Sequence, residues 1–121
     1  MTDVLIIEDN KDNARLLTYA LRRAGLQVRH ARNGPDGLAQ IRARRPDLVI
    51  MDIGLPGIDG IETTRRLRTF EPDLPVVAIT SFAMKGDREK VLEAGCNGYL
   101  EKPIDPLTVV DQILAFVRRP A

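Results

Sequence analysis

The sequence predicts an α/β protein in which five strands alternate with five helices around a parallel sheet. Short apolar runs without polar alternation recur along the chain, which is typical of strands buried on both faces. Stretches with apolar residues at helical spacing separate these runs. Glycine and proline mark the boundaries, most densely in segment 54–60, which contains three glycines and one proline. This alternation favours a doubly wound sheet with helices on both faces.

The first half of the chain contains three predicted strands. The apolar runs Val4–Ile7 and Leu48–Met51 predict two of them, and Val28 marks a short strand between them. A first helix is predicted over Asn13–Ala24, where Gly25 provides a stop. A second helix is expected to begin in the segment that follows the short strand, where a proline suits the first turn, and to end before the next proline; these residues are Gly34, Pro35 and Pro46.

The second half continues the alternation. A third helix is expected from Ile61 to about Phe70, and two prolines end it before the apolar run Val76–Ile79, the fourth strand. A fourth helix over Lys85–Ala94 is followed by a short fifth strand at Gly98–Leu100. A final amphipathic helix is expected after Asp105 and Pro106, and its apolar residues are Leu107, Val110, Ile113, Leu114 and Val117.

Length and composition predict one domain over residues 1–121. The net charge of +1 gives no general electrostatic argument for binding nucleic acid or a membrane. Cys96 has no second cysteine to pair with, which fits a reducing compartment, and we interpret it as a small buried residue. No apolar stretch is long enough to span a bilayer, and residues 1–3 lack the basic segment of a signal peptide. We therefore expect a cytoplasmic protein.

Polar side chains follow four of the predicted strands directly. Because the carboxyl ends of parallel strands meet at one edge of a sheet, all of them are expected there. Taken one at a time, each residue has an ordinary explanation. Asp9 or Asn10 caps the next helix, the Thr80 hydroxyl forms a hydrogen bond with the backbone, and Lys102 lies on the surface. These separate explanations are less convincing for the whole set, because four different strands supply polar residues to the same edge. The residues after these strands are Glu8, Asp9, Asp52, Thr80, Ser81, Glu101, Lys102 and Pro103.

Asp52 is the most informative member of this set, because a carboxylate at the end of a buried strand needs a counter-ion. Neighbouring carboxylates repel one another unless a hard cation lies between them, and an oxygen-only ligand set favours Mg²⁺. One such carboxylate can act as a nucleophile and form an aspartyl phosphate. A lysine and a hydroxyl would then hold the phosphoryl oxygens.

With these residues in place, the chain resembles the receiver domains of two-component response regulators, over residues 1 to about 118. The resemblance implies a CheY-like, flavodoxin-like (βα)5 fold with strand order 2-1-3-4-5. Segments 80–87 and 95–100 are most similar to DivK-type single-domain regulators and to receivers of hybrid kinases. The residues that carry the resemblance, in the order of the family, are Glu8, Asp9, Asp52, Pro56, Gly60, Thr80, Lys102 and Pro103.

The resemblance also implies a role for each residue around the acceptor. Asp52 would accept a phosphoryl group from a histidine kinase or a histidine phosphotransfer protein. Asp9, Asp52 and the backbone carbonyl of Gly54 would bind Mg²⁺, and Glu8 would act mainly through a water molecule. Lys102 would pair with Asp52 and then with the phosphoryl oxygen.

The remaining roles concern the response to phosphorylation. Thr80 would move towards the phosphoryl group and Tyr99 would follow it, which repacks a protein-binding surface of helix 4, strand 5 and helix 5. A cis peptide bond is implied before Pro103. The protein would not be an enzyme beyond its own Mg²⁺-dependent phosphorylation and dephosphorylation. Its partners would be a kinase or phosphotransfer protein and a downstream protein, with neither nucleic acid nor membrane contacted directly.

Other classes of protein fit the residues less well. A phosphatase with an aspartyl nucleophile would need a second acid two positions after Asp52, where the chain has Gly54. A flavin or nucleotide binder would need a glycine-rich loop after the first strand, where carboxylates would repel phosphate. A receiver domain that no longer accepts a phosphoryl group remains an alternative. A receiver excised from a hybrid histidine kinase is the alternative to a free-standing regulator, which the start at Met1 favours.

Four further residues carry local hypotheses. Gly54 leaves an opening beside Asp52, and we expect this opening to affect the lifetime of a phosphorylated state, with Phe82 partly closing the other side. Phe82 and Met84 are either partner anchors or packing residues under the loop before the fourth helix. His30 has no helical-bundle context, so we interpret it as structural or exposed to solvent and not as a phosphohistidine donor.

Overall fold

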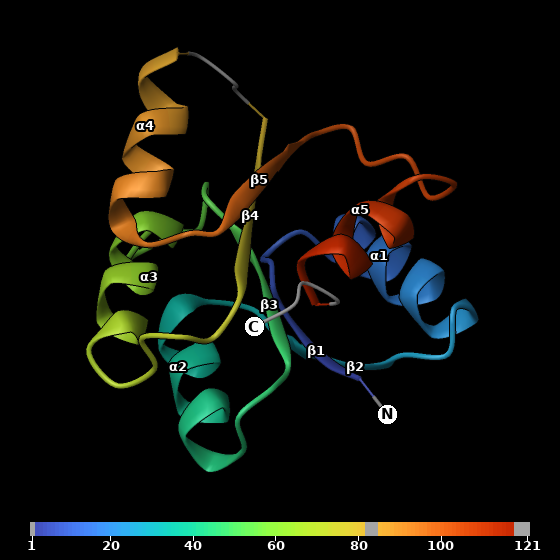
Figure 1. The fold of residues 1–121 in the computed structure, drawn as a ribbon, viewed down its shortest axis with the longest axis horizontal. Helices are drawn as coiled ribbons and strands as arrows, with labels where there is room; N and C mark the ends of the chain where they lie inside the picture. The colour runs from blue at the N-terminus through green and yellow to red at the C-terminus, as the bar shows by residue number, and fades with distance from the viewer. Residues whose placement is uncertain (1, 82–84, 118–121) are drawn as a thin grey trace.

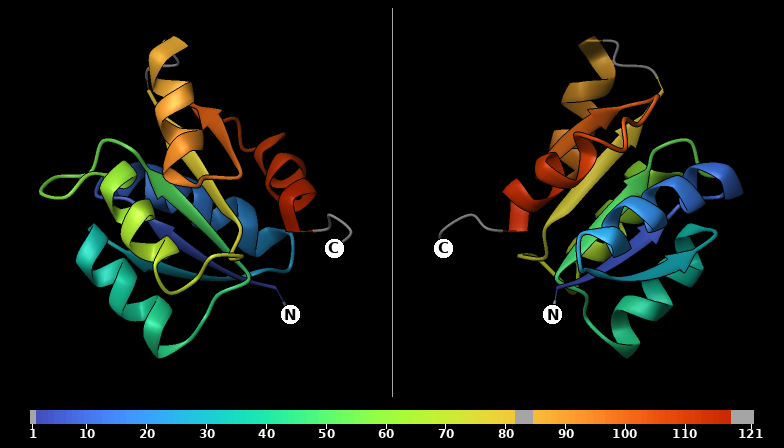
Figure 2. Two further views of the ribbon diagram at one scale, coloured as in Figure 1. Left: turned by 60° about the vertical axis from the view of Figure 1, so that its left-hand side comes forward. Right: turned by 90° about the vertical axis from the view of Figure 1, so that its right-hand side faces the viewer.

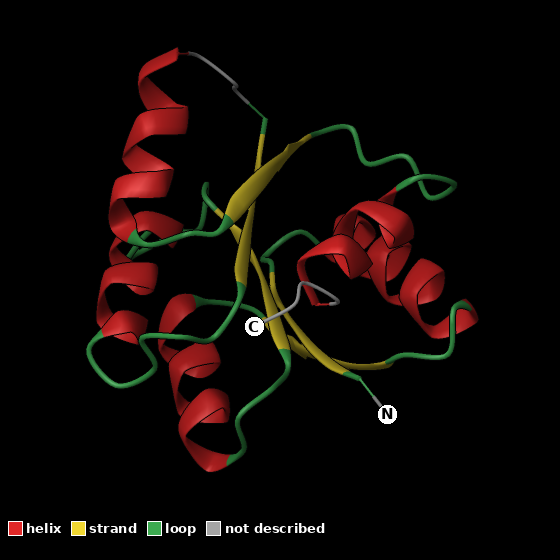
Figure 3. Ribbon diagram, viewed as in Figure 1, coloured by secondary structure: helices red, strands yellow, loops and turns green. Residues whose placement is uncertain are grey.

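The computed structural model describes residues 2–81 and 85–117, and these residues form a parallel sheet with helices on both faces (Figure 1; Figure 3). The strands are β1 (Asp3–Ile7), β2 (Gln27–Ala31), β3 (Leu48–Asp52), β4 (Val76–Thr80) and β5 (Gly98–Glu101). The helices are α1 (Lys11–Arg23), α2 (Gly34–Ala43), α3 (Gly60–Arg68), α4 (Lys85–Ala94) and α5 (Val109–Val117). The strand order β2-β1-β3-β4-β5 confirms the predicted fold class.

The helices form a layer on each face of the sheet. Helices α2, α3 and α4 cover one face, and α1 and α5 cover the other (Figure 1; Figure 2). Strands β1, β3 and β4 lie between the two layers, and every residue of these strands is buried. Because both faces are covered, these strands consist almost wholly of apolar residues, with acidic or hydroxyl residues only at their ends.

Three helices begin with a polar side chain that caps the first turn. Asn10, Asn33 and Asp59 each accept a hydrogen bond from the backbone N–H three residues later, at 3.0, 2.8 and 2.9 Å. The cap of α1 settles one question left open by the sequence, since Asn10 is the capping residue and not Asp9. The Asp9 carboxylate is therefore available at the carboxyl edge of the sheet.

Two local expectations from the sequence differ from the structure. Strand β2 has five residues where the apolar pattern indicated only Val28, because an edge strand with half-exposed residues carries little apolar signal. Leu107 was expected on the buried face of the last helix, but it lies in the turn before α5 and is 87% exposed. The Asp105 carboxylate accepts a hydrogen bond from the Leu107 N–H at 2.9 Å and so holds this turn outside the helix.

The hypotheses about Phe82 and Met84 lie outside the described residues. Within the ranges that the structure does describe, no helix combines the length and apolar character needed to cross a membrane.

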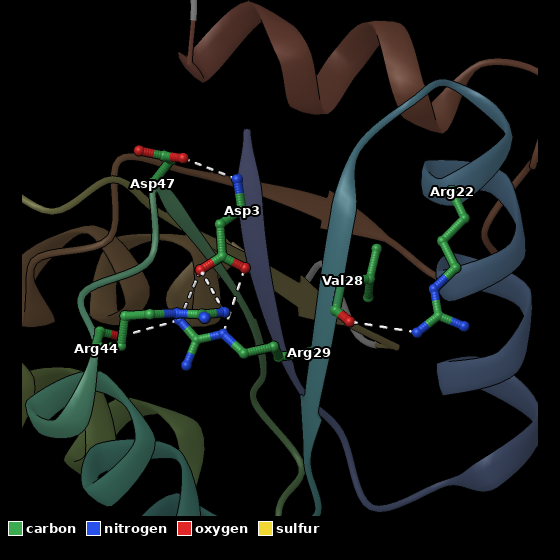
Figure 4. Close-up of polar contacts among 6 residues, drawn as sticks. All are labelled: Asp3, Arg22, Val28, Arg29, Arg44 and Asp47. Atoms are coloured by element: carbon green, nitrogen blue, oxygen red, sulfur yellow. Dashed lines mark hydrogen bonds and ion pairs between the residues drawn. The ribbon is translucent and has the colours of Figure 1, made fainter. Parts of the chain in front are cut away.

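A charge network closes the amino end of the sheet (Figure 4). The Asp3 carboxylate of β1 accepts hydrogen bonds from Arg29 of β2 at 2.8 and 3.3 Å and lies 3.5 Å from Arg44. The Asp3 backbone N–H donates to the Asp47 carboxylate at 2.8 Å, and Arg29 also donates to the Arg44 carbonyl at 2.9 Å. A largely buried carboxylate is thus fully compensated and joins the edge strand β2 to the centre of the sheet.

This network predicts a difference between two arginine substitutions. We expect Arg29→Gln to lower the free energy of unfolding by about 2 kcal/mol, because it leaves the Asp3 carboxylate buried with weaker compensation. Arg45→Gln is the matched control, because Arg45 is 47% exposed in its 2.7 Å pair with Glu71 and should cost less than about 1 kcal/mol. Urea unfolding of both variants measures the difference, and equal losses would contradict this account.

Candidate functional site

Three carboxylates meet at the carboxyl edge of the sheet. Glu8 and Asp9 follow β1, and Asp52 is the last residue of β3. Oxygen atoms of the three carboxylates lie within 4.8 Å of one another. Asp9 is exposed, whereas Glu8 and Asp52 are only 3% and 5% exposed. Two carboxylates buried this closely are unfavourable unless a cation or a proton compensates them.

Lys102 supplies part of this compensation. Its Nζ atom lies 3.2 Å from Asp52 Oδ1 and 3.3 Å from Glu8 Oε1, so one ammonium contacts both buried carboxylates. The Lys102 backbone N–H donates to the Thr80 carbonyl at 2.9 Å, and the Lys102–Pro103 peptide bond is cis, as the family resemblance implied. Lys102 is therefore held at both its backbone and its side chain.

Two glycines after β3 differ in the space around them: Gly54 lies beside open space, and Gly60 is tightly packed. The Gly54 N–H donates to Asp52 Oδ1 at 3.1 Å, and a Cβ at Gly54 would meet only that oxygen, at 3.9 Å. A Cβ at Gly60 would instead collide with the Asp52 carbonyl and come within 2.8 Å of Ile53 Cα. Gly60 thus lets the start of α3 pack directly against the end of β3, while Gly54 leaves the side of Asp52 open.

Thr80 and Tyr99 occupy the next two strands. Thr80 ends β4 and is 7% exposed, so its hydroxyl is at the same buried edge as Asp52. Tyr99 in β5 lies opposite Ala78 of β4 in the strand register, and its half-buried ring packs against the core on the α2–α4 side. The Arg88 guanidinium lies 5.3 Å from the centre of the Tyr99 ring. The structure therefore places the two predicted switch residues on adjacent strands.

The pKa values of the cluster follow from burial and from the sharing of charge. Burial, together with the neighbouring Asp52 carboxylate, raises the pKa of Glu8 to about 7. Burial alone would raise the pKa of Asp52 as well, but interactions with Glu8, the Gly54 N–H and Lys102 lower it on balance. Burial opposes the charged form of Lys102, yet the charges of Asp52 and Glu8 raise its pKa. Without a metal ion, Glu8 is therefore the carboxyl group of the pair that keeps its proton up to about pH 7, whereas Asp52 is ionised.

The residues at this edge fit a divalent metal ion. The Glu8 Oε2 atom is buried and has no hydrogen-bond partner among the described residues. Such an atom is costly unless a cation or a water molecule approaches it. Three carboxylates with one open side offer the oxygen ligands that Mg²⁺ prefers.

The sequence did not indicate two neighbours of the site. The side chain of Asn13, in the first turn of α1, lowers the pKa of Glu8. Arg88 contacts the ring of Tyr99 from α4. Both lie on helix surfaces with no pattern of their own in the sequence, and only the packing of the helices on the sheet brings them to the site.

Comparison with known proteins identifies the class. Residues 4–114 match the response regulator receiver domain, so the chain belongs to this family. It is 38% identical to the polar-differentiation response regulator DivK of Brucella anthropi over 116 residues, which cover 94% of each chain. A two-component response regulator from Clostridium difficile superposes with a TM-score of 0.93 at 27% identity over 98% of each chain. The chemotaxis protein CheY4 of Vibrio cholerae, at 24% identity and a TM-score of 0.92 over 96% of this chain and 98% of that one, shares the fold.

Membership of the family has general consequences. Receiver domains are phosphoacceptors and not enzymes in the usual sense, they bind Mg²⁺ through acidic residues, and they interact with kinases and downstream targets. The acidic cluster of Glu8, Asp9 and Asp52 lies where this chain can supply such residues.

The two loop glycines predict opposite effects of added side chains. We expect Gly60→Ala to lower the free energy of unfolding by about 1–3 kcal/mol, because the new Cβ meets backbone atoms that cannot move aside cheaply. Gly54→Ala is the control and should change it by less than about 0.5 kcal/mol, because its Cβ has open space. Thermal and urea unfolding test this, and a Gly54 variant as unstable as the Gly60 variant would refute it.

The raised pKa of Glu8 predicts a pH dependence in the absence of divalent cations. The folded state keeps the Glu8 proton up to about pH 7, whereas the unfolded chain loses it near its ordinary pKa of 4.5. The contribution of Glu8 to stability is therefore complete below pH 4.5 and is lost as the pH rises through 7. Between pH 5 and 8, wild type should lose about 2 kcal/mol relative to Glu8→Gln, which does not titrate. A stability difference that stays constant over this range would contradict the prediction.

Proposed function

We propose that residues 1–121 form a single receiver domain that acts as a stand-alone response regulator and accepts a phosphoryl group on Asp52. The donor is a phosphohistidine of a histidine kinase or of a histidine phosphotransfer protein. One observation carries this proposal: the buried Asp52 carboxylate contacts the Lys102 ammonium at 3.2 Å and lies within 4.8 Å of the carboxylates of Glu8 and Asp9. This combines a nucleophile, a fixed positive charge and metal ligands at one strand end.

The reaction is a transfer between two nucleophiles. An Asp52 carboxylate oxygen attacks phosphorus, an O–P bond forms, and the N–P bond to the donor histidine breaks with its electron pair going to the imidazole nitrogen. The lowered pKa of Asp52 keeps this carboxylate ionised. The Gly54 N–H and Lys102 both contact Oδ1, which fixes the orientation of the carboxylate before the donor arrives.

Asp9, Asp52 and the Gly54 carbonyl are the proposed direct ligands of Mg²⁺, with Glu8 acting through a water molecule. The bound ion would neutralise charge on the phosphoryl oxygens, as in other phosphoryl transfers. Lys102 then pairs with a phosphoryl oxygen as well, because phosphorylation increases the negative charge beside it. The open space at Gly54 gives water a path to the phosphoryl group, which supports our expectation that this position affects the lifetime of the phosphorylated state.

The output is a change in packing. Phosphorylation adds acceptor oxygens at the edge where β4 ends, and the Thr80 hydroxyl is the neighbouring donor. When the Thr80 side chain moves towards the phosphoryl group, it leaves space that the Tyr99 ring can fill. This favours a second packing of α4, β5 and α5. We propose that this surface binds a downstream protein, that neither nucleic acid nor membrane is contacted directly, and that the protein works in the cytoplasm.

Intact-mass measurement after incubation with Mg²⁺ and phosphoramidate tests the central step. Wild type should gain one phosphoryl group, and Asp52→Ala should gain none. Asp111→Ala is the matched control, because it removes an acidic residue from the first turn of α5 outside the cluster, and it should react like wild type. Adducts on both wild type and Asp52→Ala, or on neither, would refute the assignment of Asp52.

A further inference from the structure

A second site is suggested by a groove between α1 and the edge strand β2. The groove has a volume of about 750 Å³ and lies beside α1 and β2, which run next to each other on one side of the molecule (Figure 2). Among the described residues, its lining contains no carboxylate but five cationic side chains, which are Lys11, Arg15, Arg22, Arg23 and Arg32. Because the whole chain has a net charge of only +1, the rest of the chain is net negative. The positive charge is therefore concentrated in this groove.

Three of the five cationic side chains form a row along α1. Lys11, Arg15 and Arg22 lie on one face of α1, at intervals of four and seven residues, and extend over roughly 17 Å of helix. Arg22 reaches across to β2, where it donates to the Val28 carbonyl at 3.4 Å (Figure 4). Lys11, Arg15 and Arg32 are exposed and form no ion pair within the described residues. Unpaired like charges this close together favour a multiply charged anion.

An aromatic ring completes the lining. Tyr19 is 61% exposed, which is unusual for so large a side chain, and its hydroxyl accepts a hydrogen bond from Arg23 at 3.1 Å. The Arg23 guanidinium lies 5.7 Å from the centre of the ring and helps to hold it. An exposed ring beside a row of cations offers a stacking surface next to phosphate-binding groups.

We propose that this groove binds a nucleotide that carries several phosphates. Lys11, Arg15 and Arg32 contact the phosphates, and the base stacks on Tyr19. The volume lies within the usual range for small-molecule sites. This site is separate from the Asp52 cluster, and no covalent step is involved.

An acidic protein segment fits the groove less well than a nucleotide does. Protein interfaces depend on clustered apolar or aromatic anchors. Among the described residues the exposed large apolar side chains are Tyr19, Leu92 and Leu107, and only Tyr19 lines the groove. A single ring with surrounding charge matches one base with its phosphates better than it matches a protein surface.

Calorimetric titration with ATP tests the proposal, without Mg²⁺ so that the acidic cluster takes no part, and at about 0.15 M salt. Wild type should bind, and Arg15→Gln/Arg32→Gln should bind at least about tenfold more weakly. The control Arg65→Gln/Lys90→Gln removes the same charge from exposed positions on α3 and α4 and should bind like wild type. Amide chemical-shift changes on titration should concentrate in α1 and β2.

Two smaller probes separate the two parts of the site. Tyr19→Ala should weaken ATP binding severalfold and leave the binding of inorganic tripolyphosphate unchanged, whereas Tyr19→Phe should retain both. Adenosine alone should bind much more weakly than ATP, because it lacks the charges that the arginines contact.

Several outcomes would overturn the proposal. These are absence of ATP binding, an equal loss in the control variant, and an effect of Tyr19→Ala that is the same for ATP and tripolyphosphate. Tighter binding of a polyglutamate peptide or of single-stranded DNA, lost in the Arg15→Gln/Arg32→Gln variant, would assign the groove to a macromolecule instead. The same variant should still be phosphorylated by phosphoramidate, so the two proposals fail independently.

Discussion

The contact of the Lys102 ammonium with two buried carboxylates is the constraint on which the carboxyl edge of the sheet depends. The Lys102 Nζ atom lies 3.2 Å from Asp52 Oδ1 and 3.3 Å from Glu8 Oε1, and without it the two buried carboxyl groups would face each other with no cation beside them. The order of the strands makes this contact possible. Lys102 follows β5 and reaches across the end of β4, and its backbone bond to the Thr80 carbonyl holds it there. The cation that compensates the acidic residues at the ends of β1 and β3 is thus supplied by the residue that follows β5, the last strand in the chain.

The buried carboxylates at the two ends of the sheet differ in how fully their charge is compensated. At the amino end, Asp3 is contacted by Arg29 and Arg44, and its carboxylate is fully compensated. At the carboxyl end, one cation serves two buried carboxylates, and Glu8 Oε2 has no partner within the described chain. In the first arrangement, both carboxylate oxygens accept a hydrogen bond from Arg29. The second is incomplete without a proton or a metal ion, which is the property required of a site that changes its charge.

The central strands could be predicted from the sequence to within about a residue, because burial on both faces leaves a continuous apolar run. Strand β2 could not, since its residues include the half-buried Arg29 and the exposed His30 and show no clear apolar face. Leu107 was misplaced for a related reason: its spacing fits the helix, but the Asp105 side chain holds the turn before it. The spacing of apolar residues indicates that a helix forms, whereas the residue at which the helix begins depends on a particular hydrogen bond.

The candidate site shows the same division. The strand ends that supply Glu8, Asp9, Asp52 and Lys102 could be predicted, because parallel strands bring their carboxyl ends to one edge. The contributions of Asn13 and Arg88 could not, because they depend on how α1 and α4 pack on the sheet. The raised pKa of Glu8 is also a tertiary property, since it results from burial next to Asp52.

The proposed nucleotide groove and the acidic cluster share one short piece of backbone. Glu8 donates its N–H to the Ala31 carbonyl of β2 at 3.0 Å, and the Glu8 carbonyl lies 2.7 Å from His30 Nε2. His30 lines the groove, and Lys11 follows the acidic pair after only one intervening residue. A ligand that moves β2 or the first turn of α1 would therefore move Glu8 directly. Linkage makes such an effect reciprocal: if the ligand changes the affinity of the cluster for a metal ion, the metal ion changes the affinity for the ligand by the same factor.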